Sequence, residues 1–85
     1  MPYIDNEARK KFDITTLQLT TAGELNYVIS ELCSQYLAQK GLNYTHCNEI
    51  IGVVECVKQE FYRKVTAPHE EQKIKENGDI SYKKI

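Results

Sequence analysis

The stretch Thr21–Leu37, TAGELNYVISELCSQYL, decides the fold. It opens with Thr21 and, three residues later, Glu24. This is the pattern of a capping box, in which each side chain bonds the backbone amide of the other residue. Apolar side chains then recur at the spacing of one helical face: Leu25, Val28, Ile29, Leu32, Cys33, Tyr36 and Leu37. Gly41 stands where a left-handed C-terminal cap is expected, so the stretch predicts a helix over residues 22–40.

A second apolar face follows in the next segment. It comprises Ile50, Val54, Val57, Phe61 and Val65. The spacing predicts a helix over residues 45–66 that starts at Thr45 and stops before Pro68, because proline disfavours helix in the residue before it. Two helices joined by a short loop pack most simply as an antiparallel hairpin. We therefore expect a hairpin with Phe61 in its core.

Weaker signals flank this hairpin. Residues 5–19 predict a first helix capped by Asp5 or Asn6, although threonines near its end lower the helical propensity. Residues 68–76 predict a short polar helix, and residues 77–85 a tail that begins with an Asn-Gly turn. The sequence thus predicts an all-α domain of three to four helices over residues 1–85.

Length and charge restrict the class of protein further. A chain of 85 residues forms one small domain, whose limited core favours oligomerisation. With 11 basic and 12 acidic residues the net charge is -1, which argues against strong non-specific binding to nucleic acid or membrane. The sequence has no apolar run of the ~20 residues that cross a bilayer. The N-terminus lacks the pattern of a signal peptide, so we expect a cytosolic protein.

Two small residues lie on the polar side of the 45–66 helix, one turn apart. They are Gly52 and Cys56. A glycine inside a helix costs about 1 kcal/mol relative to alanine, a cost that close approach of another backbone often offsets. Packing against the first helix and packing against a second copy of the chain explain the pair equally well, and so does chance.

Motifs for catalysis and metal binding are missing from the sequence. It contains no Gly-rich phosphate loop, no His-Glu-x-x-His and no Cys-x-x-Cys. The three cysteines predict reduced, mostly buried thiols, and two histidines are too few for a typical zinc site. We therefore expect a protein that is not an enzyme and that holds no cofactor and no metal.

One cluster suits an anionic, planar ligand. Tyr62 and Arg63 lie side by side near a helix end, with Lys58 one turn earlier and Arg9 on the first helix. A tyrosine ring stacks on a base and a guanidinium binds phosphate in bidentate fashion, so a nucleotide fits this set. The alternative is a solvated basic helix end that complements the helix dipole.

Several motifs give the chain a specific resemblance. Residues 23–29, GELNYVI, match the pattern GxLNYxI, and residues 48–58, NEIIGVVECVK, resemble NEVIGVLECVK. Residues 60–70, EFYRKVTAPHE, and the later ENGDI resemble EFYRRV-APYE and ENGDV. These motifs resemble a family of small uncharacterised proteins from bacteria and their phages. His69 and Lys64 depart from it, where tyrosine and arginine are usual.

The resemblance implies a helical fold and a prokaryotic or phage setting, and it implies no activity. It draws attention to Asn26 and Tyr27, which are polar residues on an otherwise apolar helix. We take both as further candidates for ligand binding. A structural alternative is that Asn26 and Glu60 hold the C-terminal tail through hydrogen bonds.

Two functional hypotheses follow from these observations. The first is a homo-oligomer that binds a nucleotide-derived ligand between copies, because the chain is too small to enclose such a ligand alone. A phage-encoded version would act as a sponge for a bacterial immune signal. The second is a helical module that inhibits or adapts a larger host or phage protein.

Overall fold

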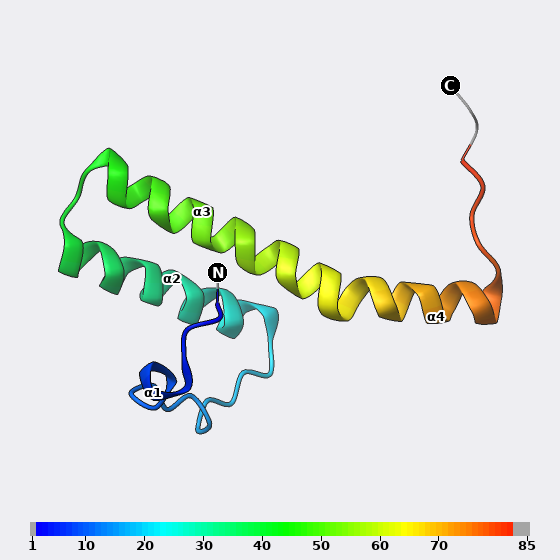
Figure 1. The fold of residues 1–85 in the computed structure, drawn as a ribbon, viewed down its shortest axis with the longest axis horizontal. Coiled ribbons are helices and arrows are strands. Elements are labelled where there is room, and N and C mark those ends of the chain that lie inside the picture. Colours follow the sequence, from blue (N-terminus) through cyan, green and yellow to red (C-terminus); the bar gives the residue numbers. More distant parts are fainter. Residues whose placement is uncertain (1, 83–85) are drawn as a thin grey trace.

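The computed structural model describes residues 2–82, and within them all regular structure is helical. The elements are α1 (Asn6–Arg9), α2 (Ala22–Lys40), α3 (Tyr44–Phe61), a π-helical turn η1 (Tyr62–Thr66) and α4 (Ala67–Asn77). α3, η1 and α4 follow one another without a break and form one long rod (Figure 1). The prediction of an all-α chain is confirmed.

The capping box that begins α2 is also confirmed. Thr21 Oγ1 accepts the Glu24 amide at 3.1 Å, and Glu24 Oε1 accepts the amides of Thr20 at 2.8 Å and of Thr21 at 3.2 Å. At the other end the Gly41 amide bonds the Leu37 carbonyl. Gly41 has φ 97° and ψ 149°, so its φ needs glycine, but its ψ is extended rather than left-handed helical.

The start of α3 differs by one residue from the prediction. Asn43, not Thr45, is the cap: its Oδ1 accepts the His46 amide at 2.8 Å. His46 Nδ1 also lies 2.8 Å from the Gly41 carbonyl oxygen, which ties the α2–α3 connection to the first turn of α3.

The predicted 45–66 helix ends with η1 at Thr66 and the predicted 68–76 helix corresponds to α4, Ala67–Asn77, but the expected break before Pro68 is absent. The chain stays helical through Pro68 and ends at Asn77 instead, with the Gly78 amide bonding the Ile74 carbonyl. A proline inside a helix lacks its amide and crowds the preceding turn. Here η1 relieves the conflict: the chain widens to i→i−5 bonding, as in the bond from the Ala67 amide to the Tyr62 carbonyl.

The first helix is much shorter than the predicted 5–19. It covers only Asn6–Arg9, capped by Asp5, whose Oδ1 accepts the Ala8 amide. Beyond it, Asp13 Oδ1 accepts both the amide and the hydroxyl of Thr15. This side-chain turn competes with helix and accounts for the early end. The tail is described only to residue 82 and is not helical, and residues 83–85 lie outside the described part.

α2 and α3 lie side by side near their connection and run in opposite directions (Figure 1). The Tyr36 hydroxyl on α2 donates to Glu49 Oε1 on α3 at 2.9 Å. Farther from the connection the apolar side chains stay open to solvent: Leu25 is 49% exposed on α2 and Phe61 is 61% exposed on α3. The prediction that Phe61 lies in a core is therefore wrong for the single chain.

None of the described residues is buried. The accessible surface is 8158 Å². A folded monomer of this mass exposes about 5,200 Å², so the chain exposes about 3,000 Å² more than a compact monomer. The Cα radius of gyration is 17.6 Å, against about 12 Å for a compact domain of this length. The single chain is an extended assembly of helices without a closed core.

Candidate functional site

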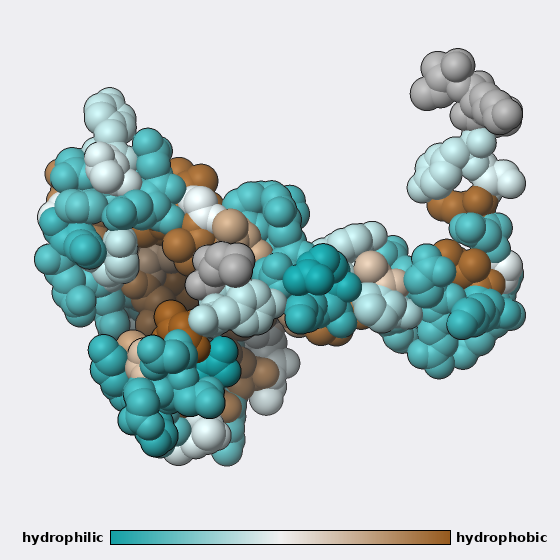
Figure 2. All heavy atoms as spheres, in the orientation of Figure 1, coloured by the Kyte–Doolittle hydropathy of each residue, from teal (hydrophilic) through white to brown (hydrophobic). Residues whose placement is uncertain are grey.

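The main apolar surface lies where α2 and α3 meet. An open groove of about 190 Å³ is lined by Leu32, Cys33, Tyr36, Ile50, Val53 and Val54. Apolar side chains at this helical spacing share one face, and here the faces of both helices form the two walls. Figure 2 shows hydrophobic surface gathered in a hollow over α2, between α3 and the N-terminal segment. We call the groove and the adjoining Val57 and Phe61 the α2–α3 apolar face.

Most of this apolar face is open to solvent. Leu32 is 57% exposed, Val53 56% and Val57 52%. Cys33 and Ile50 are half-buried and form its floor. An apolar surface this continuous is uncommon on a monomer and marks a place where another molecule binds.

Tyr36 gives the groove a polar edge. Its hydroxyl donates to Glu49, and this bond to a carboxylate raises the pKa of Tyr36 because ionisation would place two negative charges together. The phenol therefore stays neutral, and it links the two helices at the rim without placing an unpaired charge in the groove.

Two of the predicted cations, Arg63 and Lys58, each have a carboxylate partner three residues earlier in the chain. Arg63 donates from one nitrogen to both oxygens of Glu60, at 3.0 and 2.9 Å. Lys58 lies 3.6 Å from Glu55. Tyr62 donates to Glu70 at 2.6 Å, and this bond raises its pKa. The structure thus places these three side chains in separate local pairs.

Arg9 lies apart from that group. Its Nε donates to the Ile4 carbonyl at 2.7 Å and closes the short α1 turn. Among the described contacts none joins Arg9 to Tyr62 or Arg63. Its role in the described chain is local.

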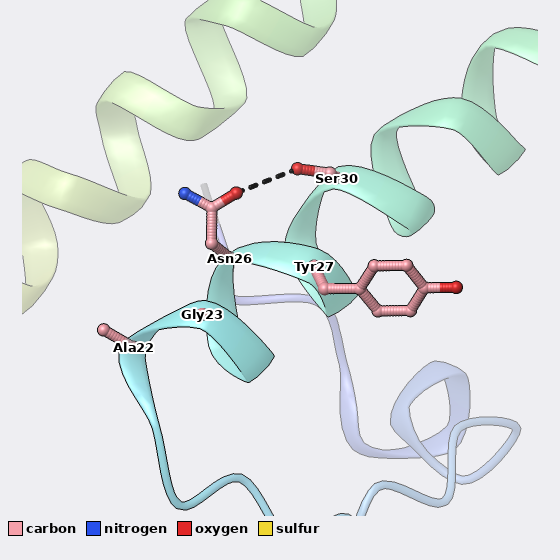
Figure 3. Close-up of a pocket in the computed structure, with 5 residues that line it drawn as sticks. All are labelled: Ala22, Gly23, Asn26, Tyr27 and Ser30. Carbon is pink, nitrogen blue, oxygen red and sulfur yellow. Dashed lines mark hydrogen bonds between the residues drawn. The ribbon is translucent and has the colours of Figure 1, made fainter.

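Asn26 and Tyr27 come together at a second place, near the start of α2. With Ala22, Gly23 and Ser30 they line an open hollow of about 540 Å³ (Figure 3). Asn26 Oδ1 accepts the Ser30 hydroxyl at 3.2 Å, while the Tyr27 ring projects away from the helix and is 65% exposed. All five residues come from one helix and none is cationic, so the hollow alone offers an anion no charged partner.

One cluster was missed by the sequence analysis. The Tyr3 hydroxyl donates to Glu60, and Lys64 Nζ lies 5.6 Å from the centre of the Tyr3 ring. The bond from Tyr3, followed by the bond from Arg63, lowers the pKa of Glu60. Glu60 therefore fastens the N-terminal segment to the end of α3, and among residues 2–82 no described hydrogen bond joins it to the C-terminal tail. No local pattern predicts a contact between residues 57 positions apart.

The expectations about metal binding and about the cysteines can be compared with the structure. The described residues contain no group of three or more His, Cys, Asp or Glu side chains that could hold a metal ion. Cys33, Cys47 and Cys56 are free thiols, but none is buried as expected: Cys33 and Cys47 are half-buried and Cys56 is exposed. Within residues 2–82 no helix is long and apolar enough to cross a membrane.

Comparison with known proteins assigns the chain to a family. The family described as Domain of unknown function (DUF6899) matches residues 1–80. The chain belongs to this family. No curated protein and no solved structure matches the chain significantly. Membership carries no activity with it, so the function has to be argued from the surfaces of the DUF6899 chain itself.

Proposed function

We propose that this DUF6899 protein is a non-enzymatic binding protein that works through protein–protein contacts on its α2–α3 apolar face. The observation that supports the proposal is the open core: no described residue is buried, while apolar side chains of two helices form one continuous groove. Apolar surface of this extent destabilises a chain in water and is stabilised when another protein covers it. The proposal keeps the protein–protein contacts of the second hypothesis and the self-association of the first.

The hairpin and the homo-oligomer belong to this proposal. α2 and α3 touch near their connection and remain apart elsewhere, so a partner that fills the gap would complete the antiparallel hairpin. Such a protein would act in the cytosol, and in the host cytosol if a phage encodes it, as the resemblance to phage proteins implies.

Native mass spectrometry of tagged protein purified from cells tests the proposal. We expect the chain to be recovered in a complex, either with itself or with another protein, and Val54→Glu to abolish recovery of the complex. Ala38→Glu adds the same charge to the same hairpin, at an exposed position on the polar side of α2, and is expected to change nothing. Recovery of a compact, isolated chain of 9.8 kDa would contradict the proposal.

Capture of a nucleotide-derived ligand is a second candidate, and it rests on the Asn26–Tyr27 hollow. Both residues line this hollow, although the Asn26 amide and the exposed Tyr27 ring point to different sides of α2 (Figure 3). An exposed ring can stack on a base, and an amide can form hydrogen bonds with it. A second chain would have to supply the cation, because none lines the hollow.

Calorimetry against cyclic dinucleotides and ADP-ribose derivatives tests this candidate. We expect Tyr27→Ala to abolish binding, and Arg63→Ala to weaken it only if the partner chain brings Arg63 to the ligand. If no compound gives a heat of binding, the nucleotide-binding candidate is wrong and only the protein-binding function remains.

A further inference from the structure

The partner that covers the α2–α3 apolar face can be specified further. We propose that it is a second copy of the chain, which docks its own α2–α3 apolar face against the first to form a two-fold dimer with a shared core. This inference rests on the proposed function and names the partner of that same surface.

The first argument is area. The chain exposes about 3,000 Å² more than a compact monomer of its mass. Obligate homodimers bury about 2,000–5,000 Å² in total, or about 1,000–2,500 Å² per chain. The surplus is summed over the whole chain, and it exceeds the area that one copy buries in an obligate dimer. The N-terminal segment contributes to it, since Phe12 and Ile14 are 61% and 70% exposed, and so does the α2–α3 apolar face.

The second argument is charge. In a two-fold interface each side chain meets the same surface of its copy, so a charged residue at the centre would lie near an identical charge. The six residues that line the groove include no Asp, Glu, Lys or Arg. The carboxylate of Glu49 accepts a hydrogen bond from Tyr36 at the rim. Because each chain carries a net charge of only -1, the electrostatic repulsion between two copies is weak.

The third argument concerns the other side of α3. Nothing lies within 4 Å of the place where a Cβ on Gly52 would stand, so packing of Gly52 against the first helix is wrong. Residues 52 and 54 lie about 160° apart around the helix. The apolar surface lies on the Val54 side, and we therefore place the seam between copies there rather than at Gly52 and Cys56.

Sedimentation equilibrium and circular dichroism, measured together over a range of protein concentrations, test the inference. We expect twice the chain mass of 9.8 kDa, with a melting temperature that rises with concentration because only the dimer has a core. Val54→Glu should weaken association about 100-fold, since it buries an unpaired charge. In the single chain the new glutamate lies four residues before Lys58, a spacing that stabilises a helix, so the variant is expected to keep α3 folded. Ala38→Glu is the matched control and should dimerise like the wild type.

A mixing experiment identifies the face. Leu32→Lys and Val54→Glu each introduce like charges that meet in a self-pairing groove, so each variant alone should be monomeric. Their mixture should form a heterodimer, which native mass spectrometry separates by mass. Failure of the mixture to associate would overturn the assignment of the interface to this groove.

The wild-type result separates this inference from the proposed function. A monomer at every concentration overturns the dimer. If that monomer also lacks a cooperative unfolding transition, a different protein must cover the face, and the proposed function stands. If it unfolds cooperatively and binds no hydrophobic dye, the face is not open in solution, and both proposals fail.

Discussion

Most described side-chain hydrogen bonds join near neighbours in the sequence, and only a few single residues link separate segments. Glu60 is the clearest case, since it accepts from Tyr3 and Arg63 at once. Tyr3 is the larger cause of its lowered pKa. This contact is the one described hydrogen bond between side chains that joins the N-terminal segment to α3.

Removal of the Tyr3 hydroxyl is expected to raise the pKa of Glu60. In Tyr3→Phe the pKa should move up toward the ordinary carboxyl value but stay below it, because Arg63 remains. An NMR titration of the Glu60 side-chain carboxyl measures the shift. Tyr27→Phe, which alters a tyrosine on another helix, is the control. An unchanged Glu60 pKa in Tyr3→Phe would mean that the N-terminal segment is not held at this place.

Glu24 gives the capping box a dependence on pH. Bonds from the Thr20 amide and hydroxyl and from the Thr21 amide lower its pKa in the folded chain. A carboxyl whose folded pKa is lowered stabilises the fold above its unfolded value, and this stabilisation is lost as pH falls through the folded pKa. The helical signal of α2 should therefore weaken below about pH 4.3.

Circular dichroism between pH 7 and pH 2 checks this expectation by comparing the wild type with Glu24→Ala. The variant should be less stable at neutral pH and should lose less stability on acidification. A variant with the same acid sensitivity as the wild type would assign the pH dependence to other carboxyl groups.

At the scale of elements, sequence patterns predicted the structural features that depend on residues close together along the chain. The capping box and the apolar spacing predict the observed bounds of α2, Ala22–Lys40, because they involve residues at most four apart. The prediction for 5–19 failed where a side-chain turn at Asp13 competed with helix. The predictions for 45–66 and 68–76 located two helical segments, but they missed that a π-turn joins these segments without a break at Pro68. In the candidate site, Asn26 and Tyr27, which the sequence singled out together, line the same hollow. The sequence could not show that Arg63 and Tyr62 pair with different carboxylates.

Pro68 should determine the π-turn. In Pro68→Ala the amide and the space for regular i→i−4 bonding return, so η1 should convert to α-helix and the fold should gain up to about 3 kcal/mol. Conversion rotates α4 relative to α3 and separates Tyr62 from Glu70. The pKa of Tyr62 should then fall toward its ordinary value, because the bond from its hydroxyl to the Glu70 carboxylate raised it.

NMR chemical shifts of residues 62–66 and a titration of Tyr62 report both changes. Ala67→Ser, at a neighbouring position that keeps its amide, is the control and should retain the π-turn. Retention of the π-turn in Pro68→Ala would show that the bond between Tyr62 and Glu70, rather than the proline, holds this geometry.

At the scale of the whole molecule, the chain has helices with apolar faces but no interior. A radius of gyration of 17.6 Å and a surface of 8158 Å² describe one chain. Sequence patterning predicts which residues are apolar and on which face they lie, and it cannot say whether that face closes within the chain or between chains. The short length of the chain favours closure between chains, since a small chain can form only a limited core alone.

Phe61 distinguishes closure within the chain from closure between copies. In the single chain it is 61% exposed, so Phe61→Ala should cost less than about 1.5 kcal/mol when the protein is dilute and monomeric. When the protein is concentrated and a second copy covers this face, the same change should cost about 3–5 kcal/mol. Urea unfolding at two protein concentrations a hundredfold apart measures both values. A large cost at both concentrations would place Phe61 inside a closed monomer. A small cost at both would mean that nothing covers α3 at this position. Only a cost that grows with concentration fits a core shared between two copies.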